Sequence, residues 1–366
     1  MLIDRRLASH FDWVVFGLAV GLTLLGILTV YSATYSVASE RASLASRQFY
    51  WFIFGLVAMA VAFSFDYHRF DRLIHPFYAL VLFLLVLVHW VGTEGGGAQR
   101  WLHLGFFAVQ PSELAKLAVV LVMAKHFQFD EPAQGYGLKD LWVPCLWAGP
   151  LLLLILVQPD LGTAIIVLLV FLSMVLIGGL RARSLFSMVG AGLVLLPIGW
   201  FFLKSYQKKR IWTFLDPDLD PLGSGYHVIQ SKIAIGSGRF LGKGYLEGTQ
   251  NRLDFLPAQH TDFVFSVFAE EWGFLGCVIL LGLYFGLVFF ALRAMARAKD
   301  RLGAMLASGV VAVLFWQVVI NVAMVAGLLP VVGIPLPFFS YGGSSLVTML
   351  VGLGLLINVN MRHFTF

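Results

Sequence analysis

The sequence predicts an all-α polytopic membrane protein of about ten transmembrane helices, with a large extracytoplasmic loop between helices 7 and 8. Of its 366 residues, 59% are hydrophobic and only 12% are charged. A soluble domain has about 45–50% apolar and about 25% charged residues. The composition therefore excludes soluble, disordered and secreted disulfide-rich proteins, and the order of the apolar runs gives the helices.

Ten apolar runs are long enough to cross a bilayer, which takes about 20 mainly apolar residues. They lie at about 13–33, 50–65, 75–92, 112–127, 142–158, 162–180, 184–203, 271–292, 303–329 and 341–360. Helices 1–7 thus occupy about 13–203, and helices 8–10 occupy about 271–360. The whole chain, 1–366, is predicted to be a single membrane domain.

Lys and Arg residues predict the orientation, because short cytoplasmic loops carry an excess of both. With the N-terminus inside, the inner segments hold 13 basic and 8 acidic residues, which accounts for the whole net charge of +5. Ten spans then place both termini in the cytoplasm. The basic charge reflects topology and points to no nucleic-acid partner.

The predicted outer loop at 204–271 stands apart by its length. Loops this long are usually functional or disordered. Disordered segments are poor in aromatic residues, whereas this loop carries Tyr206, Trp212, Tyr226 and Phe240 among others. We therefore expect an ordered, functional segment.

Two charged groups are predicted near the outer ends of helices 4 and 6. Glu113 and Lys116 lie three residues apart and so on one helix face; they form either an internal ion pair or a charged cavity floor. Asp160 is placed to cap helix 6 or to line the same cavity. Arg100 either anchors to a lipid phosphate or binds a substrate pyrophosphate.

Asp262 is a candidate general base. It lies in an aromatic, apolar stretch shortly before helix 8, and apolar surroundings raise the pKa of a carboxyl group towards a range useful for proton abstraction. A helix cap or an interfacial ion pair is the structural alternative. Glu270 and Glu271 lie closer to the membrane and are rival candidates.

The segment that joins the last two helices is rich in proline and glycine and ends at Ser340, Tyr341 and two glycines. Irregular backbone at membrane depth is tolerated only where it is buried or lines a cavity. Elsewhere the glycines at 236–244 predict tight turns. The histidine spacing gives no structural zinc site, and no metal ligands are predicted.

Six segments together resemble the SEDS family (shape, elongation, division and sporulation). They are GAQRW at 97–101, QPSELAKLA at 110–118, QPDLGT at 158–163, DPLGSGYHVIQSKIAIGSG at 220–238, FLPAQHTDFVF at 255–265 and GLLPVVGIPLPFFSYGGSS at 327–345. Several long segments in the same order are more specific than any single motif. The segment at 220–238 favours the elongation branch of the family over its division branch.

The resemblance implies a peptidoglycan glycosyltransferase of the bacterial cytoplasmic membrane that acts during cell elongation. Its substrates would be undecaprenyl-diphosphate-linked glycan as donor and lipid II as acceptor, through a sugar 4-hydroxyl. Its partners would be a class B penicillin-binding protein, which is the cross-linking transpeptidase, and the elongation machinery.

The resemblance also assigns residues. Asp262 matches the family's essential acid and would be catalytic. Glu113 and Lys116 match the family's charged pair on the fourth helix, and Arg100, Asp160 and Ser340 fall in matching segments.

The implied chemistry agrees with the residues of the outer side. Attack on an anomeric carbon needs a base for the acceptor hydroxyl and positive charge for the departing pyrophosphate. Arg210, Lys232 and Lys243 are candidates for that charge. The sequence identifies no certain cofactor and leaves a divalent cation open. A lipid II flippase and a non-catalytic scaffold for the transpeptidase are the alternative functions.

Overall fold

A computed structural model describes residues 10–35, 43–95, 98–105, 107–129, 135–202, 205–216, 219–220, 223–253, 255–256 and 258–363. Each of the ten predicted runs is a helix there: α2 (Trp13–Thr34), α3 (Ser43–Ser64), α5 (Ile74–Val91), α6 (Pro111–Phe129), α7 (Trp142–Val157), α8 (Leu161–Ile177), α9 (Ala182–Phe202), α13 (Val264–Ala296), α14 (Arg301–Val325) and α15 (Gly343–Met361). Among the described residues, seven helices are long and apolar enough to span a membrane, and α8 and the first part of α9 are shorter apolar helices. The prediction of a polytopic helical membrane protein is confirmed.

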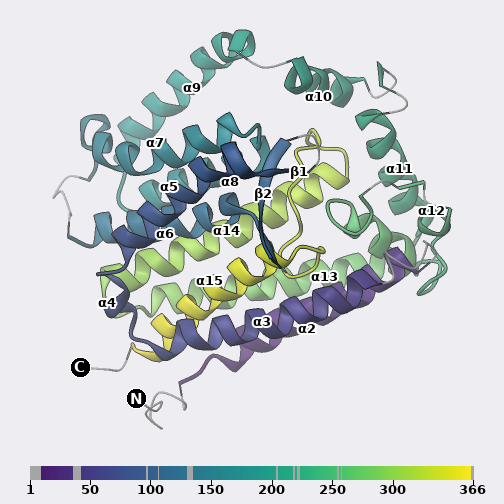
Figure 1. The fold of residues 1–366 in the computed structure, drawn as a ribbon, viewed down its shortest axis with the longest axis horizontal. Helices are drawn as coiled ribbons and strands as arrows, with labels where there is room; N and C mark the ends of the chain where they lie inside the picture. Colours follow the sequence, from purple (N-terminus) through teal and green to yellow (C-terminus); the bar gives the residue numbers. More distant parts are fainter. Residues whose placement is uncertain are drawn as a thin grey trace.

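The helices α14 and α15 form the centre of the bundle. In the most apolar windows of α14 and α15, 72% and 78% of the residues are buried, against 28–39% in the other five spans. Figure 1 shows α2 and α3 along one side of α14 and α15, and α5, α7 and α8 along the other. α9 lies at the edge of the bundle in the same view, and most of its described residues are exposed. The apolar surfaces of the peripheral helices are therefore left to face lipid.

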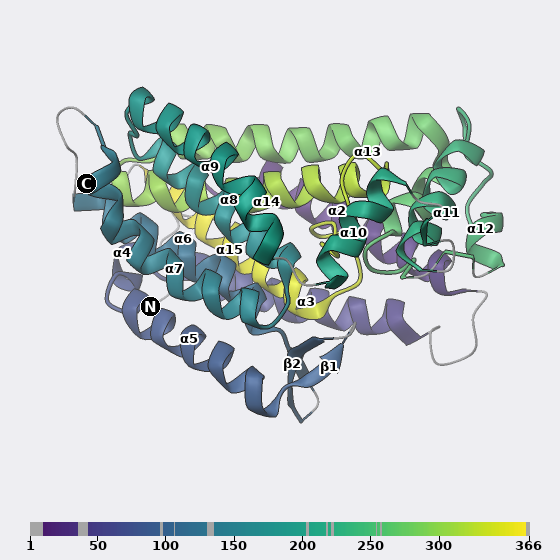
Figure 2. The same ribbon diagram turned by 90° about the horizontal axis from the view of Figure 1, so that it is seen from above.

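A small antiparallel sheet follows α5. Its strands are β1 (Thr93–Gly95), β2 (Ala98–Leu104) and β3 (Phe107–Val109), in the order β1-β2-β3. Leu102 pairs with Val109, and Gly105, with φ +69°, makes the turn between these strands. The short strands satisfy one another's backbone groups, and β2, which contains Arg100, lies at the edge of the bundle (Figure 2).

The predicted outer loop contains three helices, α10 (Ser205–Leu215), α11 (Ser224–Ser237) and α12 (Thr249–Arg252). They gather at one end of the molecule, at the right of Figure 1. Ser231 joins α11 to the bundle, because its Oγ lies 2.8 Å from Ser266 Oγ and donates to the carbonyl of Val325 at 2.6 Å. The predicted end of the loop at residue 271 is wrong, since α13 already begins at Val264.

A glycine divides α13. Gly273 has φ +63° inside a helix of 33 residues, so the carbonyls before it and the amides after it lose their helical partners. The loop after α11 supplies them: Lys243 N donates to Glu270 O at 3.0 Å, and Phe274 N donates to Arg239 O at 2.9 Å. A Cβ on Gly273 would lie 2.2 Å from the nitrogen of Gly242. Only glycine fits at this contact.

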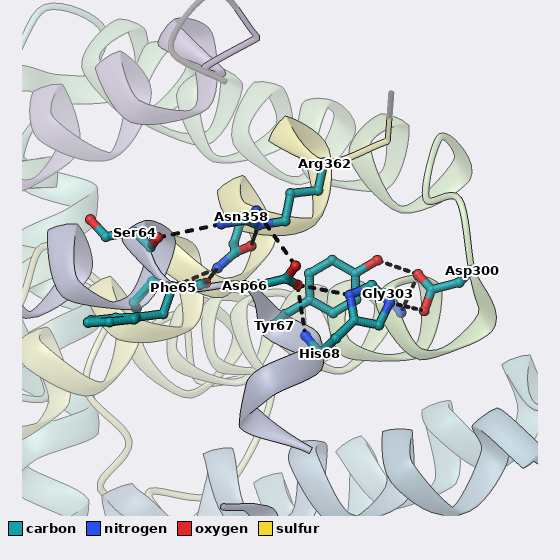
Figure 3. Close-up of polar contacts among 10 residues, drawn as sticks. Ser64, Phe65, Asp66, Tyr67, His68, Asp300, Gly303, Asn358 and Arg362 are labelled. Carbon is teal, nitrogen blue, oxygen red and sulfur yellow. Dashed lines mark hydrogen bonds and ion pairs between the residues drawn. The ribbon is translucent and has the colours of Figure 1, made fainter. Parts of the chain in front are cut away.

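A polar cluster joins two inter-helix connections and the end of α15 at the other end of the bundle (Figure 3). It includes the short helix α4 (Tyr67–Phe70). His68 lies between two carboxylates, with Nδ1 2.8 Å from Asp66 Oδ1 and Nε2 3.2 Å from Asp300 Oδ2. Tyr67 donates to Asp300, and Arg362 Nη1 lies 3.7 Å from Asp66 Oδ2. The connections before α5 and α14 therefore meet the end of α15, as ten spans require.

Candidate active site

Asp262 lies in the loop that leads directly into α13, and an amide on α14 holds its backbone. Asn321 is completely buried, and its Nδ2 donates to Asp262 O at 3.0 Å and to Ile334 O at 2.7 Å. One side chain thus fixes two loops. It presents the Asp262 carboxylate to the loop at 326–342, where a Cβ on Gly333 would lie 3.4 Å from Asp262 Oδ2.

The loop at 326–342 also reaches the start of α8. A Cβ on Gly162 would lie 2.6 Å from the carbonyl oxygen of Val332, so the loop can pack this closely only against a glycine. The contact brings Asp262, which touches the same loop, towards Asp160 at the N-terminus of α8. Segments far apart in the sequence therefore meet at one site.

The surroundings of Asp262 raise the pKa of its carboxyl group to about 6. Burial is the largest cause, because it disfavours the charged form. The positive charges of Arg210 and Arg100 lower the pKa, and the negative charge of Asp160 raises it. Asp262 is thus ionised at neutral pH and is a stronger base than an ordinary aspartate.

Asp160 is both a helix cap and part of this site. Its Oδ1 accepts the amide of Thr163 at 3.3 Å at the start of α8, and its Oδ2 accepts the hydroxyl of Ser112 at 3.0 Å. Arg100 Nη1 lies 3.7 Å from Asp160 Oδ1, and Arg100 also donates to the carbonyl of Pro159. Arg100 therefore has protein partners, and 20% of its side chain is exposed at the site.

Glu113 and Lys116 form a buried ion pair in the first turns of α6. Lys116 Nζ lies 2.7 Å from Glu113 Oε2, and the two side chains are 1% and 4% exposed. The internal pair that the spacing predicted is therefore present. Its charges balance each other inside the bundle.

Some of the remaining candidate residues lie near Asp262, and others stabilise the surrounding loops. Arg210 on α10 acts on Asp262 through its charge. Lys243 is held by Glu270, with Nζ 2.6 Å from Glu270 Oε1. Lys232 is exposed on α11 beside Gly327. Ser340 is buried, and its Oγ accepts the amide of Leu336 at 2.8 Å, so it braces the turn that precedes α15.

Glu270 and Glu271, the rival candidates for the base, serve as anchors. Glu270 is completely buried, and its Oε1 accepts the backbone amides of Thr249 at 2.9 Å and Gln250 at 3.2 Å besides Lys243. Glu271 is 2% exposed and accepts the hydroxyl of Ser32. Both carboxylates hold elements together and do not face the loop at 326–342 through any described hydrogen bond.

A cavity of about 670 Å³ opens beside the loop that carries Asp262. Its wall includes His260 and Thr261, the two residues directly before Asp262, and it ends at the start of α15. Aromatic rings and basic side chains predominate in its lining, which includes Arg47, Tyr50, Trp51, Phe54, Trp101, His103 and Tyr341. Faces of aromatic rings and cations of this kind suit a polar, ring-shaped and anionic ligand.

Two features of the candidate site, Asn321 and the cavity, were not predicted from the sequence. Asn321 is one of two amides, with Gln317, in an otherwise apolar stretch of α14, and a polar group at membrane depth was the signal that could have identified it. The sugar-sized cavity is formed by α3, the sheet and two loops, which no local pattern brings together. Within the described residues, no group of three or more His, Cys, Asp or Glu side chains is arranged to hold a metal ion.

Comparison with known proteins agrees with this arrangement. The family model for FtsW, RodA and SpoVE, described as cell cycle protein, matches residues 12–364. The chain is 42% identical over 354 residues to the peptidoglycan glycosyltransferase MrdB of Escherichia coli K12, covering 93% of each chain. It is similar to a chain of a solved complex described as a peptidoglycan synthase that coordinates polymerization and crosslinking, with TM-score 0.83, 37% identity and coverage of 97% and 99%.

The solved rod shape determining protein RodA of Thermus thermophilus is also similar, with TM-score 0.72, 32% identity and coverage of 97% of this chain and 98% of that chain. The likeness therefore extends over nearly all of the chain. The chain belongs to the FtsW/RodA/SpoVE family, the SEDS family that its motifs resemble.

Proposed function

We propose that this protein is a peptidoglycan glycosyltransferase that polymerises lipid II into glycan strands during cell elongation, with Asp262 as its general base. The observation that carries the proposal is the setting of Asp262. The Asp262 carboxyl group has a pKa of about 6 and interacts electrostatically with Arg210 and Arg100. The loop that carries it borders a cavity large enough for sugars.

The reaction follows from this setting. The Asp262 carboxylate removes the proton of the acceptor sugar's 4-hydroxyl, and the oxygen forms a bond to the anomeric carbon of the donor glycan. The bond between that carbon and the pyrophosphate oxygen breaks, and undecaprenyl pyrophosphate leaves with the electron pair. The proton rests on Asp262 until water takes it. A positioned base of this kind typically contributes about 10²–10⁴-fold in rate.

The departing pyrophosphate needs positive charge. Arg210 and Arg100 lie close enough to Asp262 to lower the pKa of its carboxyl group, so they also stand close to the reacting atoms. Preorganised charges aimed at a developing anion cost no reorganisation during the reaction. A divalent cation that arrives with the pyrophosphate could add to this charge, and the titration of activity with EDTA would detect it.

The cavity lined by His260 and Thr261, the two residues before Asp262, supports a sugar substrate. Trp101, Tyr50 and Trp51 offer flat apolar surfaces against which sugar rings pack, and Arg47 offers a cation for a phosphate or a peptide carboxylate. Its wall is formed partly by α3, one of the lipid-facing helices. A substrate anchored by an undecaprenyl chain can thus place its headgroup in the cavity while its chain stays in the bilayer.

We further propose that the Asp262 end faces away from the cytoplasm and that both termini are cytoplasmic. The distribution of Lys and Arg supports this orientation. The cluster around His68 and Asp300 joins the connections on the proposed inner side. Accessibility of single cysteines to a membrane-impermeant reagent, introduced at Arg252 and at Arg183, tests the orientation: only the position in α12 should react in intact cells.

The proposed partner is a class B penicillin-binding protein within the elongation machinery. The outer loop exposes large apolar side chains, Phe240 (62% exposed), Leu241 (72%) and Leu253 (61%), and such clusters mark interaction surfaces. Photo-crosslinking from these three positions should capture the transpeptidase. Capture only from inner positions such as Arg69 would contradict both the partner surface and the orientation.

One experiment separates the proposal from its alternatives. Purified protein, alone and with the transpeptidase, is given lipid II in vesicles, and glycan product and lipid II transfer across the bilayer are measured. Glycan formation that Asp262→Asn abolishes supports the glycosyltransferase. Transfer across the bilayer without glycan would identify a flippase, and neither activity in the presence of the transpeptidase would identify a scaffold.

A further inference from the structure

A second large cavity lies at the end of the bundle remote from Asp262. It measures about 760 Å³ and is bounded by the start of α2, the end of α13 and the end of α15. The far end of α2 contacts the loop of Asp262, because Gln259 Nε2 donates to Ala33 O at 2.9 Å. Since α2 has 22 residues, the two ends lie about 33 Å apart at 1.5 Å per residue. The two cavities are therefore separate sites.

Two arginines give this inner cavity its charge. Arg293, in the last turn of α13, and Arg297, directly after the helix, lie one turn apart, and both are exposed and line the cavity. In the part of the chain that the structure describes, neither guanidinium has an ion pair or a hydrogen bond. The one carboxylate of the lining, Asp12, already accepts the amide of Val15 at 3.1 Å and Asn360 Nδ2 at 3.0 Å. The charge of the arginines is thus available to an anion.

Aromatic side chains make up another part of the cavity lining. Phe11, Trp13 and Phe290 line the cavity, and 68% of the Trp13 surface is exposed. These residues belong to or adjoin helices that span the membrane, so the cavity lies where the bilayer meets water. Tryptophan is enriched at this depth, where an amphipathic ring is stable. The lining of the cavity thus combines two cations with large aromatic side chains.

We propose that this cavity binds the phosphate headgroup of an anionic phospholipid. Arg293 and Arg297 pair with the phosphate, and the acyl chains follow the apolar surface at Trp13 and Phe290. A bound lipid would join the end of α13 to the ends of α2 and α15, which the Asp12–Asn360 hydrogen bond already connects to each other. A free phosphate would use the arginines alone and leave the aromatic side chains without a function. The proposal requires neither the glycosyltransferase activity nor the proposed orientation.

The test measures lipid binding to the full-length protein by native mass spectrometry in detergent, with phosphatidylglycerol and phosphatidylcholine of identical acyl chains. The wild type should retain phosphatidylglycerol in preference. Each basic side chain near an anionic surface contributes roughly a fivefold gain in affinity, so Arg293→Gln/Arg297→Gln should lose about 30-fold in affinity for phosphatidylglycerol. The matched control is Arg69→Gln/Arg72→Gln, which removes two exposed charges at the same end and should bind as the wild type does.

Two results would overturn the proposal. Equal losses in both double variants would show that phosphatidylglycerol responds only to the general charge of this end. Displacement of phosphatidylglycerol by millimolar inorganic phosphate would show a site for free phosphate. Melting temperatures of the two variants, measured in parallel, distinguish loss of binding from loss of fold.

Discussion

Asn321 and Asp262 are joined by a hydrogen bond from a buried amide to a backbone carbonyl, 3.0 Å long. The same amide group holds Ile334 at 2.7 Å. The base of the proposed reaction is therefore positioned by a residue on another helix that does not contact its carboxylate through any described hydrogen bond. The position of Asp262 therefore depends on how Asn321 holds the loop before α13 and the loop at 326–342 together.

The first prediction concerns this positioning role. Asn321→Leu should lower glycan synthesis by about 10²-fold, since a displacement of about 1 Å can cost that much. The acid limb of the pH–rate profile should also shift, because the surroundings of the Asp262 carboxyl change. The matched control is Gln317→Leu, one turn away on α14 and equally buried, which should retain activity and the pH profile. Equal effects of both substitutions would indicate general damage to α14.

The second prediction concerns Asp262 itself. Asp262→Asn keeps the shape of the side chain and removes the base, so glycan synthesis should fall by about 10²–10⁴-fold. Asp262→Glu should also fail largely, because its carboxylate is displaced. The purified variants should still bind the transpeptidase. A stable Asp262→Asn protein that polymerises at nearly the wild-type rate would exclude Asp262 as the base.

The third prediction is a pH dependence of stability. The folded-state pKa of Asp262, about 6, exceeds the ordinary value of 3.8. The folded state therefore binds the proton more tightly, and its stability falls as the pH rises from about 4 to about 6 and then stays level. Asp262→Asn carries no such charge. Its melting temperature should exceed that of the wild type at pH 7.5 and approach it at pH 4, in a thermal shift series; a constant difference across the series would contradict the raised pKa.

The fourth prediction concerns the ion pair on α6. Removing one partner leaves an uncompensated buried charge, which costs about 3–5 kcal/mol, so Glu113→Ala and Lys116→Ala should each melt at a lower temperature and lose activity. Glu113→Leu/Lys116→Met should recover the melting temperature, because apolar replacement of a buried pair is often neutral. Recovered activity in the double variant would restrict the pair to a structural role. Recovered stability without activity would show that the pair serves the substrate.

The fifth prediction concerns Glu270, which accepts hydrogen bonds from the α12 segment and pairs with Lys243. Its complete burial indicates that substitution destabilises the fold. Glu270→Gln should lower the melting temperature markedly and loosen the loop after α11, as seen by faster proteolysis. Glu247→Gln, an exposed glutamate in the same loop, is the control. If Glu270→Gln left the melting temperature unchanged, Glu270 would not be needed to anchor the loop.

The sequence predicts some levels of this structure well and others poorly. Ten helices follow from local apolar runs, because a segment that crosses lipid must satisfy its own backbone. The ion pair of Glu113 and Lys116 follows from helical spacing. The strands around Arg100 do not follow from a local pattern, because each strand pairs with residues on the far side of a turn. The start of α13 was placed too late because Glu270 and Glu271 look like interfacial residues until the loop that buries them is known.

Residue roles at the site depend on long-range contacts. Lys243 and Arg100 were both candidates for holding pyrophosphate, and a sequence cannot show that Glu270 neutralises the first while Asp160 holds the second beside Asp262. Ser340 lies in a segment that the resemblance marks, yet its hydroxyl accepts the amide of Leu336 within the same turn. Its role is to hold the chain that precedes α15.

The break at Gly273 has a consequence for how the enzyme tolerates different bilayers. An unbroken α13 of 33 residues would extend about 50 Å, well beyond a hydrocarbon core of about 30 Å. A straight helix of that length would tilt in a thinner membrane, and the end of the helix next to Asp262 would be displaced. Because the chain changes direction at Gly273, the segment next to Asp262 is fixed by the 239–244 loop, while the part below follows the lipid. We therefore expect hydrophobic mismatch to be accommodated at Gly273, so that the reacting groups keep their spacing in membranes of unequal thickness.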